Sequence, residues 1–97
     1  MNYSHKIVCQ VPTSYQYSSL CRMGLNNRKV GNGSHIGEMF FYSEDEAKEH
    51  LVNRAENYYD DNEEQLNEAL SDIENYGMLH IDAATARVIE IENDEEE

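Results

Sequence analysis

Residues 43–77 read SEDEAKEHLVNRAENYYDDNEEQLNEALSDIENYG, and this stretch contains two helix patterns in succession. Ser43 is a good N-cap residue, and Glu46 three positions later completes a capping box. The residues that follow at spacings of four, four and three are those expected on one buried helix face: Ala47, Leu51, Ala55 and Tyr58. The pattern predicts a helix that begins after Ser43.

A second helix is predicted directly after the first. Asp61 with Glu64 repeats the capping signature. Gly77 stands where this helix should end, because glycine readily adopts the left-handed conformation that closes a helix. The residues expected on its buried face are Leu66, Ala69, Leu70 and Ile73. An αα-hairpin therefore occupies the middle of the chain.

Strand patterns lie on both sides of the two helices. Before them, Ile7, Cys9 and Val11 alternate with polar or exposed positions in a strand that Pro12 ends. Asn32-Gly33 favours a tight turn leading into a strand at 35–42. We expect residues 13–34 to be largely irregular.

After the helices, two further strands are predicted at 78–81 and 87–92. In the second, Ile89 and Ile91 alternate with Glu90 and Glu92, which places the isoleucines on one side. Residues 82–85 form either a turn or the first turn of a short helix. The predicted fold class is α+β, with a small antiparallel sheet of about three to four strands packed with two consecutive acidic helices.

The chain has 97 residues, which is enough for one domain and one modest core. Twenty Asp and Glu stand against seven Lys and Arg, so the formal net charge is −13. Within the single domain 1–97, residues 1–37 form a basic strand and loop segment that contains no acid. Residues 38–92 form the acidic helical segment, and 93–97 a frayed acidic tail. The basic segment either neutralises some acids internally or lies on the opposite side of the molecule.

The outward faces of the two helices carry most of the candidate binding residues. On an ideal helix Glu49, Glu56 and Asp60 lie away from the apolar face, and Glu64, Glu68 and Asp72 form a second row at intervals of four. The acids of these rows and of the turn between them, here named the acidic ridge, are Glu49, Glu56, Asp60, Asp61, Glu63, Glu64, Glu68 and Asp72. Such a ridge resembles a phosphate backbone, and a groove built from Lys and Arg to bind DNA should accept it.

The alternative explanation is a solvated helix surface, with the acids near each helix N-terminus complementing the dipole. Solvated helices usually interleave lysines at i+4, yet Lys48 with Glu44 is the one clear pair of this kind in the two helices. No Lys or Arg occurs between Asp60 and Ala86. This missing compensation favours a binding surface.

Catalytic, metal and cofactor sites are not predicted. Cys9 and Cys21 have no nucleophile signature and are expected to be free thiols. The four histidines lack zinc-ligand spacing, and His80 is expected on the surface of a strand. No apolar run is long enough to span a membrane. We therefore expect a non-enzymatic protein that contacts neither membrane nor nucleic acid and lies in the cytoplasm.

Tyrosine is abundant, with seven residues. Tyr58 and Tyr76 fit the predicted core faces of the two helices. Tyr15 and Tyr17 lie in the predicted loop and are candidate interface anchors, because tyrosine combines a large apolar surface with a hydroxyl group.

In its length, acidity and paired acidic helices from Glu49 to Asp72, the chain resembles the phage-encoded DNA-mimic inhibitors, most of all the small type I-F anti-CRISPR proteins. The resemblance implies occupation of the DNA-binding cleft of a type I CRISPR surveillance complex, inside the bacterial host cell. The basic segment 1–37 departs from the most uniformly acidic DNA mimics. Two alternatives stay open: an inhibitor of a restriction enzyme or histone-like protein, and a host adaptor that binds some basic protein.

Overall fold

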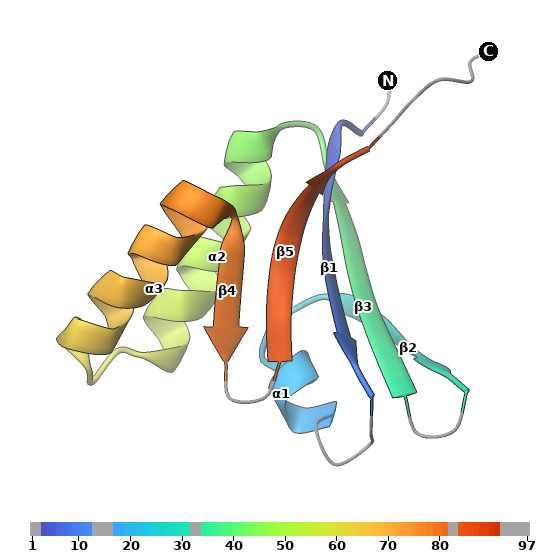
Figure 1. The fold of residues 1–97 in the computed structure, drawn as a ribbon, viewed down its shortest axis with the longest axis horizontal. Coiled ribbons are helices and arrows are strands. Elements are labelled where there is room, and N and C mark those ends of the chain that lie inside the picture. Colours follow the sequence, from blue (N-terminus) through green and yellow to red (C-terminus); the bar gives the residue numbers. More distant parts are fainter. Residues whose placement is uncertain (1–2, 13–16, 32–33, 82–83, 92–97) are drawn as a thin grey trace.

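The computed structural model describes residues 3–12, 17–31, 34–81 and 84–91. It has an α+β fold, in which three helices accompany one antiparallel sheet of five strands in the order β2-β3-β1-β5-β4 (Figure 1). In chain order the elements are β1 (His5–Val11), α1 (Tyr17–Cys21), β2 (Asn26–Val30), β3 (Ser34–Phe41), α2 (Glu44–Tyr58), α3 (Glu63–Tyr76), β4 (Met78–Ile81) and β5 (Ala84–Glu90).

The central strand β1 determines which face of the sheet is buried. Its residues Ile7, Cys9 and Val11 are at most 1% exposed, as their alternation predicts. Ile7 lies opposite Met39 of β3 and Val88 of β5, so these three side chains share one face. α2 contacts β1, β3, β4 and β5 on this face, and Figure 1 shows it passing behind β4.

The other face of the sheet has no helix of the described chain against it. The strand register places both polar and apolar residues on this face, here named the open sheet face. Its residues include Lys6, Val8, Arg28, Ile36, Glu38, Phe40, His80, Arg87 and Ile89.

The helix boundaries follow the predicted local signals, with one shift. The Ser43 hydroxyl accepts a hydrogen bond from the Glu46 backbone N–H at 3.1 Å, which confirms the first cap. At α3 the cap is Asn62, whose side chain accepts from the Gln65 N–H at 3.1 Å. The prediction of Asp61 as the cap is wrong by one residue, because the helix begins at Glu63. Gly77 ends α3 in the left-handed conformation with φ 62°, as predicted.

The segment 13–34 is more regular than its sequence predicts. It contains α1 and the edge strand β2, which raise the number of strands to five. β2 is polar and almost wholly exposed, so it has no apolar alternation, and its pairing with β3 defines it as a strand. α1 is only five residues long, and its buried Leu20 packs into the core. Residues 13–16 and the predicted turn Asn32-Gly33 lie outside the described residues, and Val30 of β2 pairs with Ser34 of β3.

The last strand differs from its prediction in extent. β5 spans Ala84–Glu90, and its buried residues are Ala84 and Ala86, whereas Ile89 is 40% exposed. Pairing with β1 puts Val88 on the core face and Ile89 on the open sheet face. Residues 82–83 and 92–97, including the predicted tail, lie outside the described residues.

The two tyrosines predicted on core faces also have different outcomes. Tyr58 is partly buried and packs against the core, as predicted. Tyr76 is 71% exposed, so its prediction is wrong. It belongs to the last turn of α3, after the buried Ile73 and immediately before the terminating Gly77.

We predict that Gly77→Ala lowers the free energy of unfolding by about 2 kcal/mol, because alanine is strained at this positive φ. An added Cβ would also lie 3.3 Å from Cβ of Val88. Gly31→Ala is a matched control, since Gly31 has φ 67° but no atom within 4 Å of the added Cβ. It should cost about 1 kcal/mol, the strain alone. Urea unfolding measures both variants, and equal losses would show that contact with Val88 does not matter.

Candidate functional site

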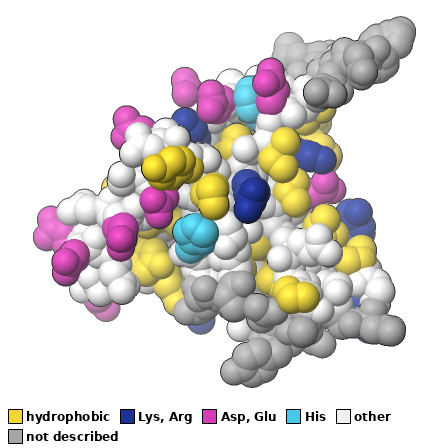
Figure 2. Space-filling view, viewed as in Figure 1, with side chains coloured by type: hydrophobic (Ala, Val, Ile, Leu, Met, Phe, Trp, Pro, Cys, Tyr) yellow, Lys and Arg dark blue, Asp and Glu magenta, His cyan; other side chains and the backbone are white. Residues whose placement is uncertain are grey.

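The acidic ridge lies on α2, α3 and the turn that joins them. Seven of its eight residues are exposed, and Asp72 is partly buried. Figure 2 shows Asp and Glu side chains gathered over α3 and the upper margin of the molecule, away from the centre of the sheet. Asp72, which is predicted on the outward face of its helix, is thus less exposed than the other seven.

The two acidic rows face different directions. Lys48 of α2 donates a hydrogen bond to the Glu74 carbonyl of α3 at 3.1 Å, so this flank of α2 faces α3. Glu68 and Asp72 instead line a hollow of about 280 Å³ between α3 and β4, together with Tyr59, Gln65, Ala69 and His80. Glu49 and Glu56 lie on the exposed surface of α2. The structure thus divides the predicted ridge into an outer surface and a groove.

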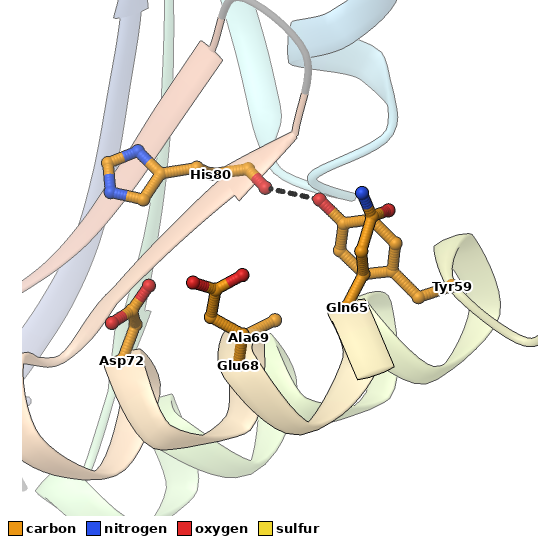
Figure 3. Close-up of a pocket in the computed structure, with 6 residues that line it drawn as sticks. All are labelled: Tyr59, Gln65, Glu68, Ala69, Asp72 and His80. Carbon is orange, nitrogen blue, oxygen red and sulfur yellow. Dashed lines mark hydrogen bonds between the residues drawn. The ribbon is translucent and has the colours of Figure 1, made fainter. Parts of the chain in front are cut away.

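The groove between α3 and β4 has a defined hydrogen-bond framework. The Tyr59 hydroxyl donates to the His80 carbonyl oxygen at 3.0 Å, which ties the end of α2 to β4. The His80 ring is exposed, as predicted, and its Nδ1 lies 2.8 Å from the Thr85 hydroxyl. Figure 3 shows Glu68 and Asp72 directed from α3 towards the strand that carries His80. Two carboxylates placed in this way can accept hydrogen bonds from a guanidinium or ammonium group of a partner.

The basic residues do not neutralise the acidic ridge. In the described parts of the chain, Glu38 pairs with Lys6 at 3.1 Å and with Arg28 at 3.7 Å, and Glu44 pairs with Lys48 at 3.4 Å. None of these ion pairs includes an acid of the ridge. Lys6 and Arg28 of the basic segment lie on the open sheet face and neutralise Glu38 there, so for these two residues both alternatives left open by the sequence apply. Figure 2 shows Lys and Arg among hydrophobic side chains over the strands.

The arginines nearest the helices are held by other contacts. Arg54 donates from Nε to the Arg22 carbonyl at 2.9 Å, and Arg22 lies 5.3 Å from the ring centre of Tyr58. Both residues therefore connect α2 to the segment after α1 and do not reach the ridge.

Of the predicted anchors Tyr15 and Tyr17, the structure describes only Tyr17. Tyr17 is 38% exposed, and its hydroxyl donates to the Asn27 side chain at 3.1 Å. Besides Tyr76, the aromatic side chains that are more exposed than Tyr17 are Tyr3, Phe40 and Tyr42, which the sequence analysis did not single out. Their signal in the sequence is the i, i+2 spacing of Phe40 and Tyr42 within the predicted strand 35–42.

Both cysteines are free thiols, as predicted. Burial raises the pKa of Cys9 to about 11, and a hydrogen bond from the Thr85 backbone opposes this only in part. The Cys9 thiol is therefore protonated at neutral pH and is a poor nucleophile.

Comparisons with known proteins give no protein-family model, no curated protein and no solved structure that matches this chain. Within residues 3–12, 17–31, 34–81 and 84–91, no three His, Cys, Asp or Glu side chains are grouped so as to hold a metal ion. None of the described helices combines the length and the apolar character needed to cross a membrane.

We predict that Glu38→Gln lowers the free energy of unfolding by about 1 kcal/mol, because it removes the partner of Lys6 and Arg28 on a partly buried surface. Glu56→Gln is the matched control, because Glu56 is exposed and has no ion pair in the described structure. It should leave stability within about 0.5 kcal/mol or raise it slightly, since it relieves self-repulsion. Urea unfolding at low salt compares the two variants. Equal changes in the free energy of unfolding for the two variants would contradict the view that the ion pairs of Glu38 stabilise the fold.

Proposed function

We propose that this protein is a DNA-mimic inhibitor, which binds the basic DNA-binding cleft of another protein or ribonucleoprotein complex and blocks access of DNA. The observation that carries the proposal is the acidic ridge itself. Eight acids lie on one helical hairpin, and in the described structure none of them has an ion-pair partner. The proposed target is a type I CRISPR RNA-guided surveillance complex, on the basis of the resemblance in length and acidic helices.

The spacing of the charges supports this proposal. Residues four apart on a helix are separated by about 6 Å along the axis. Glu64, Glu68 and Asp72 follow this spacing on α3. A cleft lined with Lys and Arg that binds DNA would find comparable rows of acceptors on this hairpin. Because the acids are unpaired, binding would not require any internal ion pair to break.

The separation of charge between the two sides of the molecule supports it further. The open sheet face carries Lys6, Arg28 and Arg87, whereas the described acids of α2 and α3 lie on the helical side. The unpaired acids of the described structure on the helical side would let the field of a basic cleft turn the helical hairpin towards it during approach. Lys6 and Arg28 of the basic segment, which departs from uniformly acidic DNA mimics, would then face away from the cleft.

The division of the ridge gives its two parts different roles. The exposed acids Glu49, Glu56 and Asp60 act over a distance and accelerate association. Glu68 and Asp72 line the groove between α3 and β4, where a side chain from the cleft could form short, charge-assisted hydrogen bonds. The turn acids Asp61, Glu63 and Glu64 connect these parts.

We predict that the protein prevents the surveillance complex from binding duplex DNA and does not bind DNA itself. Affinity for the complex should fall by at least about tenfold between 50 and 200 mM salt, because several charge contacts are screened. Gel-shift competition and association rates at several salt concentrations measure these effects. A ternary complex of target, DNA and this protein, with unchanged DNA affinity, would contradict cleft occupation. Inhibition of a restriction enzyme or a histone-like protein, without effect on the CRISPR complex, would reassign the target and keep the mechanism.

We also predict that charge reversal separates the ridge from the open sheet face. Asp60→Lys and Glu64→Lys should each weaken target binding by about tenfold, because a reversed charge in a basic cleft is repelled as well as unpaired. Stability should stay within about 0.5 kcal/mol, since both residues are exposed. Arg87→Glu on the open sheet face is the control and should leave binding unchanged. If reversals throughout the ridge leave binding intact in folded protein, the proposed function is wrong.

A further inference from the structure

Three aromatic side chains form an exposed row where β1 begins and β3 ends. Tyr3, Phe40 and Tyr42 are 43%, 45% and 50% exposed. The ring centre of Tyr3 lies 5.5 Å from that of Phe40 and 4.6 Å from that of Tyr42, with interplanar angles of 28° and 27°. Tyr3 therefore stacks between the other two rings. Exposed aromatic side chains in such number are unusual on a surface that only faces water.

The sheet register and local hydrogen bonds hold the row in place. Phe40 lies opposite Lys6 in the β1–β3 pairing, and the Lys6 ammonium is 6.0 Å from the Phe40 ring centre. The backbone N–H of Tyr42 donates to Glu46 Oε1 at 3.0 Å. These contacts place Phe40 and Tyr42 beside Tyr3 and α2.

The aromatic row borders the acidic side of the molecule. Together with Phe41, it lines an open groove of about 410 Å³, whose other residues are Glu46, Glu49, His50 and Asn53 of α2. His50 is engaged, because its Nε2 lies 2.9 Å from the Met23 carbonyl oxygen. Glu49 belongs to the acidic ridge and has no ion pair in the described structure. The groove thus combines three exposed rings with an unpaired carboxylate.

We propose that this aromatic groove binds an arginine side chain of the basic partner. The inference rests on the proposed function and adds to it a specific anchoring site. A guanidinium group is planar and weakly hydrated, so it stacks on aromatic rings while its N–H groups donate to a carboxylate. The groove offers both surfaces side by side, the row of rings and Glu49. Lysine fits less well, because its ammonium is compact and strongly hydrated.

The charges of the groove disfavour two other occupants. A second copy bound through the same patch would bring Glu46 and Glu49 close to their own counterparts, which repel each other. A nucleic-acid base could stack on the rings, but its phosphates would meet the same two carboxylates. Among these occupants, arginine matches both the rings and the charge.

The groove can be tested with a small probe and the full chain. We expect Nα-acetylarginine amide to shift the NMR signals of the Tyr3, Phe40 and Tyr42 rings, with millimolar affinity as befits so small a ligand. Nα-acetyllysine amide should bind at least about threefold more weakly. Equal responses to the two probes, or no response of these rings, would overturn the inference. Sedimentation at the same protein concentration checks for self-association, and a dimer dispersed by Tyr42→Ala would also overturn it.

Matched variants locate the binding residues. Tyr42→Ala and Glu49→Gln should each weaken arginine binding by about threefold to tenfold. Tyr76→Ala removes a tyrosine that is 71% exposed on α3. Glu56→Gln removes an acid of α2, the helix that carries Glu49, at a position outside the groove and without an ion pair in the described structure. Both should leave the probe affinity unchanged. Equal losses in the groove variants and their controls would show a response to overall charge or aromatic content only.

This test is separate from that of the proposed function. Probe binding requires no target protein, whereas inhibition requires displacement of DNA from a target. If ridge reversals abolish inhibition but the probe does not bind, the groove inference fails and the function stands. If the probe binds the groove but no basic DNA-binding protein is inhibited, the function fails and the arginine site remains.

Discussion

The one-sided burial of the sheet is the constraint on which the rest of the structure depends. Ile7, Cys9 and Val11 of β1 are buried against the helices, and the opposite face of the same strand carries Lys6, Val8 and Gln10. The covered face is packed closely enough that a Cβ on Gly37 would lie 3.0 Å from Cδ1 of Leu20. The apolar faces of α2 and α3 pack on this side. Glu49 and Glu56 of α2 therefore lie on the outer surface, whereas Glu68 and Asp72 at the margin of α3 line the groove beside β4, and the open sheet face is left for other contacts.

Local signals in the sequence predict the helices well and the sheet less well. Ser43 and Gly77 mark helix ends through backbone hydrogen bonds and a left-handed conformation, which depend on a few neighbouring residues. β2 has no apolar pattern, because it is an exposed edge strand that exists through its pairing with β3. Which side of β5 is buried depends on its register with β1, and the alternation of isoleucine and glutamate along the strand does not reveal that side.

In the candidate site too, features that depend on one helix are predictable from the sequence, and features that depend on contacts between elements are not. Seven acids of the ridge are exposed, as helical periodicity predicts. Asp72 differs because β4 lies beside α3 and forms a groove with it, which periodicity along one helix does not reveal. The row of Tyr3, Phe40 and Tyr42 joins residues almost forty positions apart, so only the β1–β3 pairing brings them together.

Some of the acidic residues stabilise the helices, and the others do not. Glu44, Asp45 and Glu46 lie in the first turn of α2, where they complement the helix dipole. At the same end of the hairpin, α3 has no basic residue in its last turn, and Lys48 from α2 donates to its Glu74 carbonyl instead. Glu49, Glu56 and Glu68 lie beyond the first turns, without ion pairs in the described structure. They add self-repulsion to a chain of charge −13, which helix stability does not explain and the proposed binding function would.

An inhibitor that bound a basic cleft through charge alone would compete poorly with DNA. Duplex DNA carries about one charge per 1.7 Å of its axis, more than helical rows can offer. An inhibitor that relied only on electrostatics would also lose affinity with salt as steeply as DNA does. Contacts that DNA cannot reproduce are needed to slow dissociation, and buried aromatic anchors are typical of such contacts. The aromatic groove meets the ridge at Glu49, so a single approach could engage both. In this arrangement the acids would govern how fast the complex forms, and the rings would govern how long it lasts.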